Sequence, residues 1–405
     1  MRRGTKIALV AVLVGVGLAG VLTTHTDERL RRLIFPDKVH RILIHYTAWD
    51  GRRRPALVVV PAWYKRGMTR ALPLVISPHG RDQAISYTAD RWGDLPARDG
   101  FFVVCPAGEG RVLPSLPFSA PGEIEDLARM PDIVQHALPW LHIDRQCIYA
   151  IGDSMGGQEV LSLAARFPDR LAGVVAMDPV ADLATRYWQM RYSQRSGTES
   201  QRDLVTEVGG TPLQVPFDYA QRSPMTFVDN LAFDGLPLQL WWSRVDRIVI
   251  DQATTQTGLL YRRIRALNPR AAVWQVVTDL PHGGAFDACH DLPRAIAFLR
   301  PHGVWRQVRE NPPLGWCYKS WEPYVDVWDY RFSTSPLPDH FWTVRDITPH
   351  RLTVTTPAPF VAAVPTTTTR SVLTVHLGRR VRHVRVVNGY LRLLFPPGTT
   401  TAYWR

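Results

Sequence analysis

Cysteine is scarce in this sequence, and its scarcity excludes two common classes of small protein. Only four cysteines occur among the 405 residues. None forms a CxxC pair or has the cysteine and histidine spacing of structural zinc sites. A disulfide-stapled scaffold and a zinc module are therefore excluded, and we expect neither a metal nor an organic cofactor. If a disulfide forms, we expect it between Cys289 and Cys317, because both lie in loop-like sequence.

Signatures of nucleic-acid readers are also missing, although the chain is strongly basic. The formal net charge is +12 at pH 7. Such a charge favours contact with anionic surfaces, for example lipid headgroups, wall polymers or acidic substrates. No reader helix, zinc knuckle or RNA-binding signature accompanies it. We therefore expect no nucleic-acid partner, and instead expect association with a membrane or the cell envelope.

Long apolar runs are missing except at the N-terminus. A basic start (MRRGTK) precedes an uncharged run over 7–22, IALVAVLVGVGLAGVL. This run is shorter than the about 20 residues that usually span a bilayer, and the small residues at 17–19 suit signal-peptide cleavage. A signal peptide and a short membrane anchor within residues 1–25 are both compatible with it. Either one places the rest of the chain outside the cytoplasm.

From residue 38 the chain alternates between apolar runs and amphipathic stretches. The apolar runs include LPLVISPHG, GFFVVCPAG, QCIYAIGDS, LAGVVAMDP and PLQLWWSRVD. Because they are almost continuously apolar, they predict strands buried on both faces, in a mostly parallel sheet covered by helices. Two β-rich segments before residue 62 predict an antiparallel edge. We place an α/β domain at residues 38–310.

Two other regions differ from this alternation. Residues 183–225 are polar, aromatic and irregular, which predicts a lid-like insertion above the carboxyl edge of the sheet, where ligands bind in open α/β folds. From about residue 318, segments such as RLTVTTP, SVLTVHLG and VRHVRVVNG alternate with period two between Pro, Thr and Asn-Gly turns. That alternation predicts a small antiparallel β domain over residues 318–405.

The stretch IGDSMGG over 151–157 carries the clearest chemical signal. Ser154 follows a predicted strand, precedes a predicted helix and has glycines on both sides. G-x-S-x-G in this context is the nucleophile elbow, which exposes a serine at a sharp turn. Such a serine needs a base and an orienting acid, which follow it along the chain in the order acid, then histidine.

The partners of Ser154 are expected at the ends of later strands. His282, in DLPHGG, follows the last predicted strand of the sheet and is our candidate base. Asp246 ends the preceding strand in LWWSRVD and is our candidate acid, with Asp178 and Asp251 as competitors. This set predicts a serine hydrolase that forms and then hydrolyses an acyl-enzyme.

Further residues surround this candidate triad. The amides of Met155 and Arg81 are the expected oxyanion-hole donors, and His79 is expected to shape that loop by hydrogen bonding. Tyr187 and Trp188 are candidate substrate contacts or parts of a packed lid. Asp153 either faces the site, where it would raise the pKa of the histidine or discourage anionic substrates, or points outward without a role.

Three longer stretches carry a resemblance to a known family. IDRQCIYAIGDSMGG, RSPMTFVDNLAFDGLPLQLWWSRVDRIV and LYRRIRALNPRAAVWQVVTDLPHGG resemble the catalytic domain of prolyl-oligopeptidase-like serine hydrolases. LPLVISPHGRD and GFFVVCPAGEG are similar to the polyhydroxybutyrate depolymerase and feruloyl esterase branch of the α/β-hydrolases. The resemblance covers roughly residues 55–300, and it implies an α/β-hydrolase fold with Ser154, Asp246 and His282 as the triad.

Several functions remain open at this point. The first is an exported hydrolase of small or polymeric esters, and the second is a serine peptidase of the same mechanism. The third is a hydrolase scaffold that only binds. A fourth is an SGNH/GDSL esterase, because GDS opens that fold and Asp287 with His290 matches its D-x-x-H. The position of GDS after several strands argues against this last class.

Overall fold

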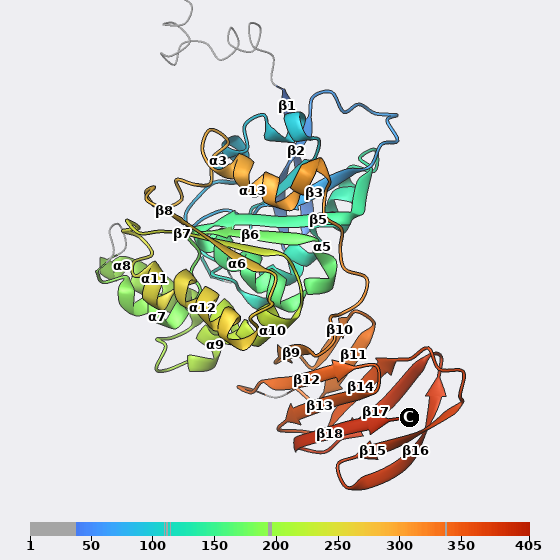
Figure 1. Cartoon of the computed structure of the whole chain (residues 1–405). Coiled ribbons are helices and arrows are strands. Elements are labelled where there is room, and N and C mark those ends of the chain that lie inside the picture. The colour runs from blue at the N-terminus through green and yellow to red at the C-terminus, as the bar shows by residue number, and fades with distance from the viewer. Residues whose placement is uncertain (1–37, 109, 111, 114, 193–196, 337) are drawn as a thin grey trace, which may run out of the picture.

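The computed structural model describes residues 38–108, 110, 112–113, 115–192, 197–336 and 338–405. Figure 1 shows an α/β domain followed by a β domain formed by the C-terminal part of the chain, drawn in orange and red. The predicted signal or anchor segment, residues 1–25, lies outside the described residues. No helix of the described residues is long and apolar enough to cross a membrane.

One mixed sheet organises the α/β domain. Within the described residues it has eight strands in the order β1-β2-β4-β3-β5-β6-β7-β8. β1 pairs antiparallel with β2 and β2 with β4, whereas all later neighbours pair parallel. The predicted antiparallel edge is confirmed. The strands are β1 (Val39–Thr47), β2 (Arg53–Pro61), β3 (Leu72–Ile76), β4 (Phe102–Pro106), β5 (Ile143–Asp153), β6 (Gly173–Met177), β7 (Leu238–Ser243) and β8 (Val273–Thr278).

Helices cover both faces of this sheet, as the continuous apolar strands predict (Figure 1). Successive side chains of a strand point to opposite faces, so Phe102 and Val104 of β4 join one core while Val103 and Cys105 join the other. The first core includes side chains of α5 (Pro121–Ala137), α6 (Ser154–Arg166), α10 (Val228–Phe233) and α12 (Thr257–Leu267). The second includes those of α3 (Ile85–Arg91), α4 (Leu95–Asp99) and α13 (Leu292–Leu299).

The β domain is a continuous antiparallel sheet that bends over a single core. Its ten strands in the described residues have the order β10-β11-β14-β17-β16-β15-β18-β13-β12-β9. The bounds are β9 (Trp316–Ser320), β10 (Tyr324–Val327), β11 (Tyr330–Thr334), β12 (Trp342–Thr348), β13 (Arg351–Thr356), β14 (Phe360–Pro365), β15 (Val372–Leu377), β16 (Arg380–Val387), β17 (Tyr390–Phe395) and β18 (Gly398–Trp404). Both halves of the sheet bury side chains in one aromatic cluster that includes Trp316, Trp342, Phe360 and Trp404.

The predicted pairing of Cys289 with Cys317 is wrong. All four cysteines lie in described residues and all are free. Cys317 lies in strand β9 rather than in a loop, and it is buried, whereas Cys289 is exposed. Cys317 is thus packed inside the β domain, whereas Cys289 lies at the surface in the turn before α13.

The β domain packs against the end of α6 and against α10. Arg166, the last residue of α6, is buried and forms ion pairs with Glu125 and Glu322. The hydroxyl of Tyr318 donates to the carbonyl oxygen of Arg166 at 2.7 Å. The side-chain oxygen of Asn230 accepts from the amide of Lys319 at 2.8 Å. Polar contacts therefore fix the β domain to the helix that begins at the candidate nucleophile.

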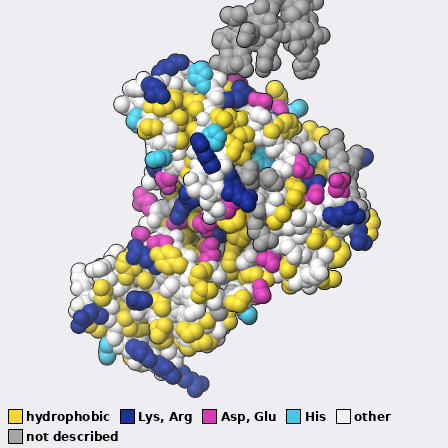
Figure 2. All heavy atoms as spheres, turned by 180° about the vertical axis from the view of Figure 1, so that it is seen from behind, with side chains coloured by type: hydrophobic (Ala, Val, Ile, Leu, Met, Phe, Trp, Pro, Cys, Tyr) yellow, Lys and Arg dark blue, Asp and Glu magenta, His cyan; other side chains and the backbone are white. Residues whose placement is uncertain are grey.

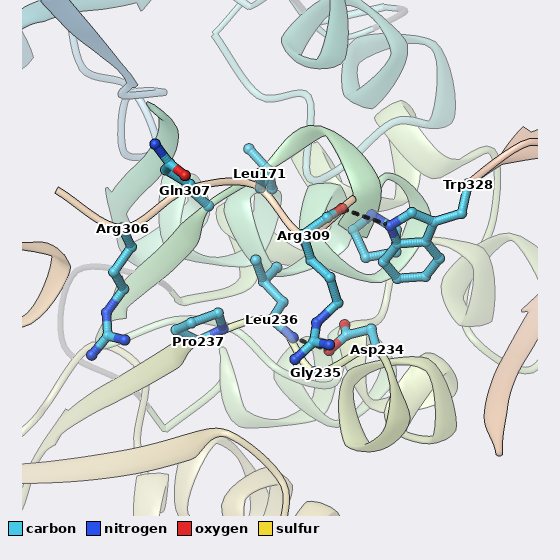
Figure 3. Close-up of a pocket in the computed structure, with 11 residues that line it drawn as sticks. Leu171, Asp234, Gly235, Leu236, Pro237, Arg306, Gln307, Arg309 and Trp328 are labelled. Atoms are coloured by element: carbon cyan, nitrogen blue, oxygen red, sulfur yellow. Dashed lines mark hydrogen bonds between the residues drawn. The ribbon is translucent and has the colours of Figure 1, made fainter. Parts of the chain in front are cut away.

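A cavity of about 410 Å³ lies at this junction, near the amino ends of β6 and β7. Figure 3 shows that Asp234, Arg309 and Trp328 line it, with Arg306 and Gln307 of the connecting segment. Asp234 is buried, and burial raises the pKa of its carboxyl well above the ordinary value. This cavity is at the opposite edge of the sheet from Ser154, which follows the carboxyl end of β5. It is therefore separate from the candidate active site.

Candidate active site

Ser154 stands at a sharp turn between β5 and α6. β5 ends at Asp153 and α6 begins at Ser154, whose φ is +56°, a value that L-residues rarely adopt. A side chain at Gly156 would collide with the carbonyl oxygen of Pro78, so the turn packs directly on the loop after β3. The strained serine and the close approach are the features of a nucleophile elbow.

His282 and Asp246 form a hydrogen-bonded pair. The distance from His282 Nδ1 to Asp246 Oδ2 is 2.8 Å, and Asp246 Oδ1 accepts from the amides of Ile248 and Val249 at 2.8 and 2.9 Å. These amides fix the carboxylate in place. Burial lowers the pKa of His282, but the hydrogen bond and negative charge of Asp246 outweigh it and leave that pKa above the ordinary value. The pair therefore supplies an oriented imidazole whose protonated form is stabilised.

The other ring nitrogen of His282, Nε2, has no hydrogen-bond partner in the described part of the chain. Nε2 is buried and forms no hydrogen bond with any residue that the structure describes. The hydrogen bond from Ser154 to this nitrogen is therefore not formed here, and such bonds commonly tighten only when substrate binds. Burying an acceptor without a hydrogen bond costs free energy. A hydrogen bond to Nε2 from a hydroxyl group that approaches it would therefore be favourable.

Asp153 and Arg91 connect the loops of Ser154 and His282. Arg91 Nη1 lies 3.0 Å from Asp153 Oδ2, and Arg91 Nη2 donates to the carbonyl oxygen of Gly283. Gly283 has φ +68°, and a Cβ there would lie only 2.8 Å from Asp153 Oδ2. Residues adjacent to the nucleophile and to the histidine thus touch each other. Asp153 is buried in this bridge and does not point outward.

Asp178 lies beside the pair but bonds to backbone instead of the imidazole. Its Oδ1 accepts from the amide of Ser243 and its Oδ2 from the amide of Gly283, both at 2.9 Å. Burial raises the pKa of Asp178 to about 6. The carboxylate therefore holds the end of β7 and the histidine loop together. Asp178, Asp246 and His282 have ligand atoms within 4.8 Å of one another, which is close enough for a metal ion, but Nδ1 of the histidine is already engaged by Asp246.

The remaining competitors lie away from this cluster. Asp251 is an exposed residue immediately before α11 (Gln252–Thr255), and its side chain makes no capping hydrogen bond. His290 is exposed as well, in the turn that precedes α13. Neither is placed beside the imidazole of His282, so the geometry favours Asp246 and His282 over the D-x-x-H alternative.

The loop after β3 faces the start of α6. The N–H of Arg81 donates to no residue that the structure describes, while Met155 is the second residue of α6 and lies in its first turn, where backbone N–H groups lack helical acceptors. His79 is buried, and its ring nitrogens lie 2.7 Å from the carbonyl oxygens of Gly80 and Ala107. These contacts match the loop-shaping role expected of His79.

The insertion packs over the elbow. It contains α7 (Leu183–Gln189), α8 (Gly197–Val208) and α9 (Pro216–Gln221), and its buried side chains share one cluster with Met155. Tyr187 is part of that cluster and contacts Tyr219, whereas the neighbouring Trp188 is 44% exposed. Tyr187 thus packs within the insertion, and Trp188 is the one of the two candidate contacts that is open to solvent.

Sequence reasoning missed two arginines near this site. Arg186 of α7 is buried, and burial, then the charge of Arg81, lower its pKa to about 10 while Asp246 opposes this. Arg91 lies on α3, 62 residues before Asp153. No local motif signals either residue, because each reaches the site only through the tertiary fold.

The strand order, the helices on both faces and the serine with positive φ after β5 together decide the fold. The chain has the α/β-hydrolase fold. No protein-family model matches its sequence, and no curated protein is similar enough to count as a relative. Evidence from other proteins therefore comes from solved structures alone.

Two solved structures illustrate the likeness of the α/β-hydrolase chain. Acylaminoacyl peptidase of Pyrococcus horikoshii superposes with a TM-score of 0.53 at 16% identity, over 70% of this chain and 44% of its own. Dipeptidyl peptidase 4 of Porphyromonas gingivalis gives 0.51 at 18% identity, over 68% of this chain and 37% of its own. This chain thus matches less than half the length of either peptidase. The prolyl-oligopeptidase-like resemblance is confirmed as a likeness of fold.

Proposed function

We propose that this chain is a serine hydrolase with Ser154 as nucleophile, His282 as general base and Asp246 as orienting acid. The observation that carries the proposal is the 2.8 Å bond between His282 Nδ1 and Asp246, which leaves Nε2 buried and without a partner among the described residues, in a chain whose Ser154 has the positive φ of an elbow serine. Asp246 fixes the tautomer that keeps Nε2 free to accept a proton. The fold of the two peptidases named above agrees with this chemistry.

The mechanism follows from these positions. Nε2 of His282 takes the proton of Ser154 Oγ as that oxygen attacks the substrate carbonyl, and the carbonyl oxygen becomes an oxyanion. The amides of Met155 and Arg81 stabilise it, aided by the positive end of the α6 dipole. The imidazolium then protonates the leaving group, and an ester oxygen or amide nitrogen departs. A water deprotonated by His282 finally hydrolyses the acyl-enzyme and restores Ser154.

We infer that esters are preferred over peptides. Trp188 and Tyr192, on and after α7, are 44% and 81% exposed on the insertion that packs over the elbow. Aromatic surfaces of this kind suit apolar acyl or alcohol groups. Peptide hydrolysis is the second candidate, because the two superposed structures are peptidases. Export and association with the envelope remain part of the proposal, on the strength of the N-terminal run and the basic charge.

Active-site labelling tests the proposal. A fluorophosphonate probe should form one adduct on the intact protein, at Ser154, and Ser154→Ala should abolish it. His282→Ala should abolish labelling and turnover, whereas His290→Ala, the matched control, should leave both intact. The opposite result for these two histidines would contradict the assignment. Short-chain, long-chain and aromatic esters, assayed against peptide amides, then decide between the two substrate classes.

A further inference from the structure

The C-terminal end of the β domain carries positive charge alone. No aspartate, glutamate or lysine occurs from residue 347 to the C-terminus, while eight arginines do: 351, 370, 379, 380, 382, 385, 392 and 405. Figure 2 shows such side chains in dark blue along the free end of this domain, far from the α/β domain. Opposite charges that would neutralise this end must therefore come from outside it.

A cleft opens within this charged end, where two strands separate. β16 pairs with β15 from Arg380 to Arg385 but with β17 only at Val386 and Val387. From Arg380 to Arg385, β16 is hydrogen-bonded to β15 but not to β17. The sheet is therefore open between β16 and β17 along this part of the strand. A cavity of about 660 Å³ lies in this opening. Its apolar wall includes Val375, Leu377, Val384, Leu393 and Phe395.

Two arginines share the face of β16 that borders the apolar wall. Directly paired residues of neighbouring strands have side chains on the same face. Arg380 pairs with Leu377, and Arg382 pairs with Val375, whose side chain is buried in the core of the domain. Arg382 and Arg380 therefore continue the core-facing row of Val384 and Val386 into the open cleft.

These arginines have no counter-charge among the residues that the structure describes. Neither Arg380 nor Arg382 forms an ion pair or side-chain hydrogen bond with a residue in the described part of the chain, and the same holds for Arg379 and Arg392 at the rim. Arg380 and Arg382 are exposed at the cleft and so are accessible to a ligand. A guanidinium group is more weakly hydrated than an ammonium group and binds phosphate strongly, often through two parallel hydrogen bonds. The cleft thus combines a phosphate-binding pair with an apolar wall.

We propose that this cleft binds an anionic phospholipid. Arg380 and Arg382 hold the phosphate, Arg379 and Arg392 lie at the rim, and an acyl chain lies against Val375, Leu393 and Phe395. The cavity volume is within the range of small-molecule sites. A free phosphate would use the arginines but leave the apolar wall uncovered, which favours a lipid over a soluble anion. This site is distinct from the catalytic centre and does not rest on the hydrolase proposal.

Calorimetry with a monomeric lipid tests the proposal on the full chain. Dihexanoyl-phosphatidylglycerol, kept below its micelle-forming concentration, avoids any partitioning of the N-terminal apolar run into vesicles. We expect one binding site for this lipid. The double variant R380Q/R382Q should weaken binding at least about tenfold, because it removes charged hydrogen-bond donors. R370Q/R385Q removes the same charge from exposed positions outside the cleft, and its binding should stay within about twofold of the parent.

Two comparison ligands distinguish a phospholipid from a soluble phosphate. Dihexanoyl-phosphatidylcholine and glycerol phosphate should each bind at least about tenfold more weakly than the phosphatidylglycerol, since one is zwitterionic and the other lacks acyl chains. Equal binding of glycerol phosphate would show a soluble-anion site and overturn the lipid assignment. An equal loss of phosphatidylglycerol affinity in both double variants would show that the whole basic surface attracts the lipid, and would contradict a specific site in the cleft.

Photocrosslinking supplies a readout that does not depend on a folded variant. A photoactivatable phosphatidylglycerol should attach to peptides of β15 to β17 in the parent protein, and attachment elsewhere would contradict the proposal. The thermal unfolding midpoints of both double variants should equal that of the parent, which would show that the substituted β domain stays folded.

Discussion

Replacing Asp178 by asparagine tests the electrostatics beside the histidine. Burial raises the pKa of this carboxyl from 3.8 to about 6. The native state therefore binds this proton more tightly than the unfolded state. Protonated Asp178 therefore contributes to the free energy of unfolding. This contribution is fully present below the unfolded pKa, near pH 4, and is lost as the pH rises through 6. A rise of about two pKa units corresponds to about 3 kcal/mol in full. Part of it is already lost at pH 4, just above the unfolded pKa of 3.8, so the free energy of unfolding of Asp178→Asn should gain about 2 kcal/mol on the parent between pH 4 and pH 7.

Urea unfolding at four pH values between 4 and 7 measures this difference. Asparagine also leaves one of the amides of Ser243 and Gly283 without an acceptor, but that loss is the same at every pH and shifts the curve without changing its slope. Asp251→Asn, at an exposed position, is the control and should run parallel to the parent. Parallel curves for Asp178→Asn as well would refute the reasoning.

Three further perturbations each remove one charged group, the third being Glu123, which is buried in α5. Asp246→Asn should lower kcat about 10⁴-fold, through loss of the correct histidine tautomer, and Asp251→Asn should change it at most about twofold in the same ester assay. Arg91→Met leaves the carboxylate of Asp153 buried without its partner, so stability should fall by about 3 kcal/mol in urea titrations. The double variant R91M/D153N should recover much of that loss, and no recovery would show that the pair is not the cause. Burial raises the pKa of Glu123 to about 8, so the native state loses stability as the pH rises through 8, and Glu123→Gln should raise Tm at pH 9 but not at pH 4.

The fold could be predicted because its strands are apolar on both faces. LPLVI, FVVCP and GVVAM are completely buried, and a run of that kind has few alternatives to a central parallel strand. The β domain could be predicted for a different reason, since alternation with period two, as in YLRLLF of β17, survives in the observed burial. The expected boundary at residue 318 differs slightly from the start of β9 at Trp316, because aromatic residues near strand ends carry no sharp signal.

The candidate triad could be proposed from sequence because each of its residues follows the end of a predicted strand. Ser154, Asp246 and His282 follow strand ends, and strand ends of a parallel sheet meet at one edge. Asp153 could not be interpreted from sequence, because its partner Arg91 comes from a distant helix. The disulfide was predicted wrongly for a similar reason. Whether Cys317 is in a loop or a strand depends on its pairing with β12, where Trp316 pairs with Ile347, and that pairing is a tertiary contact.

Helix α6 connects the β domain to Ser154, the proposed nucleophile. The helix runs from Ser154 to Arg166, and its far end is held by Tyr318 and Glu322 of the β domain. A displacement of the β domain would therefore be transmitted to Ser154 through this helix, which is about 20 Å long. If the β domain is seated on a lipid surface, the serine is held at a fixed height above that surface. The distance of the scissile bond from the membrane would then be set by the length of one helix and the size of one domain.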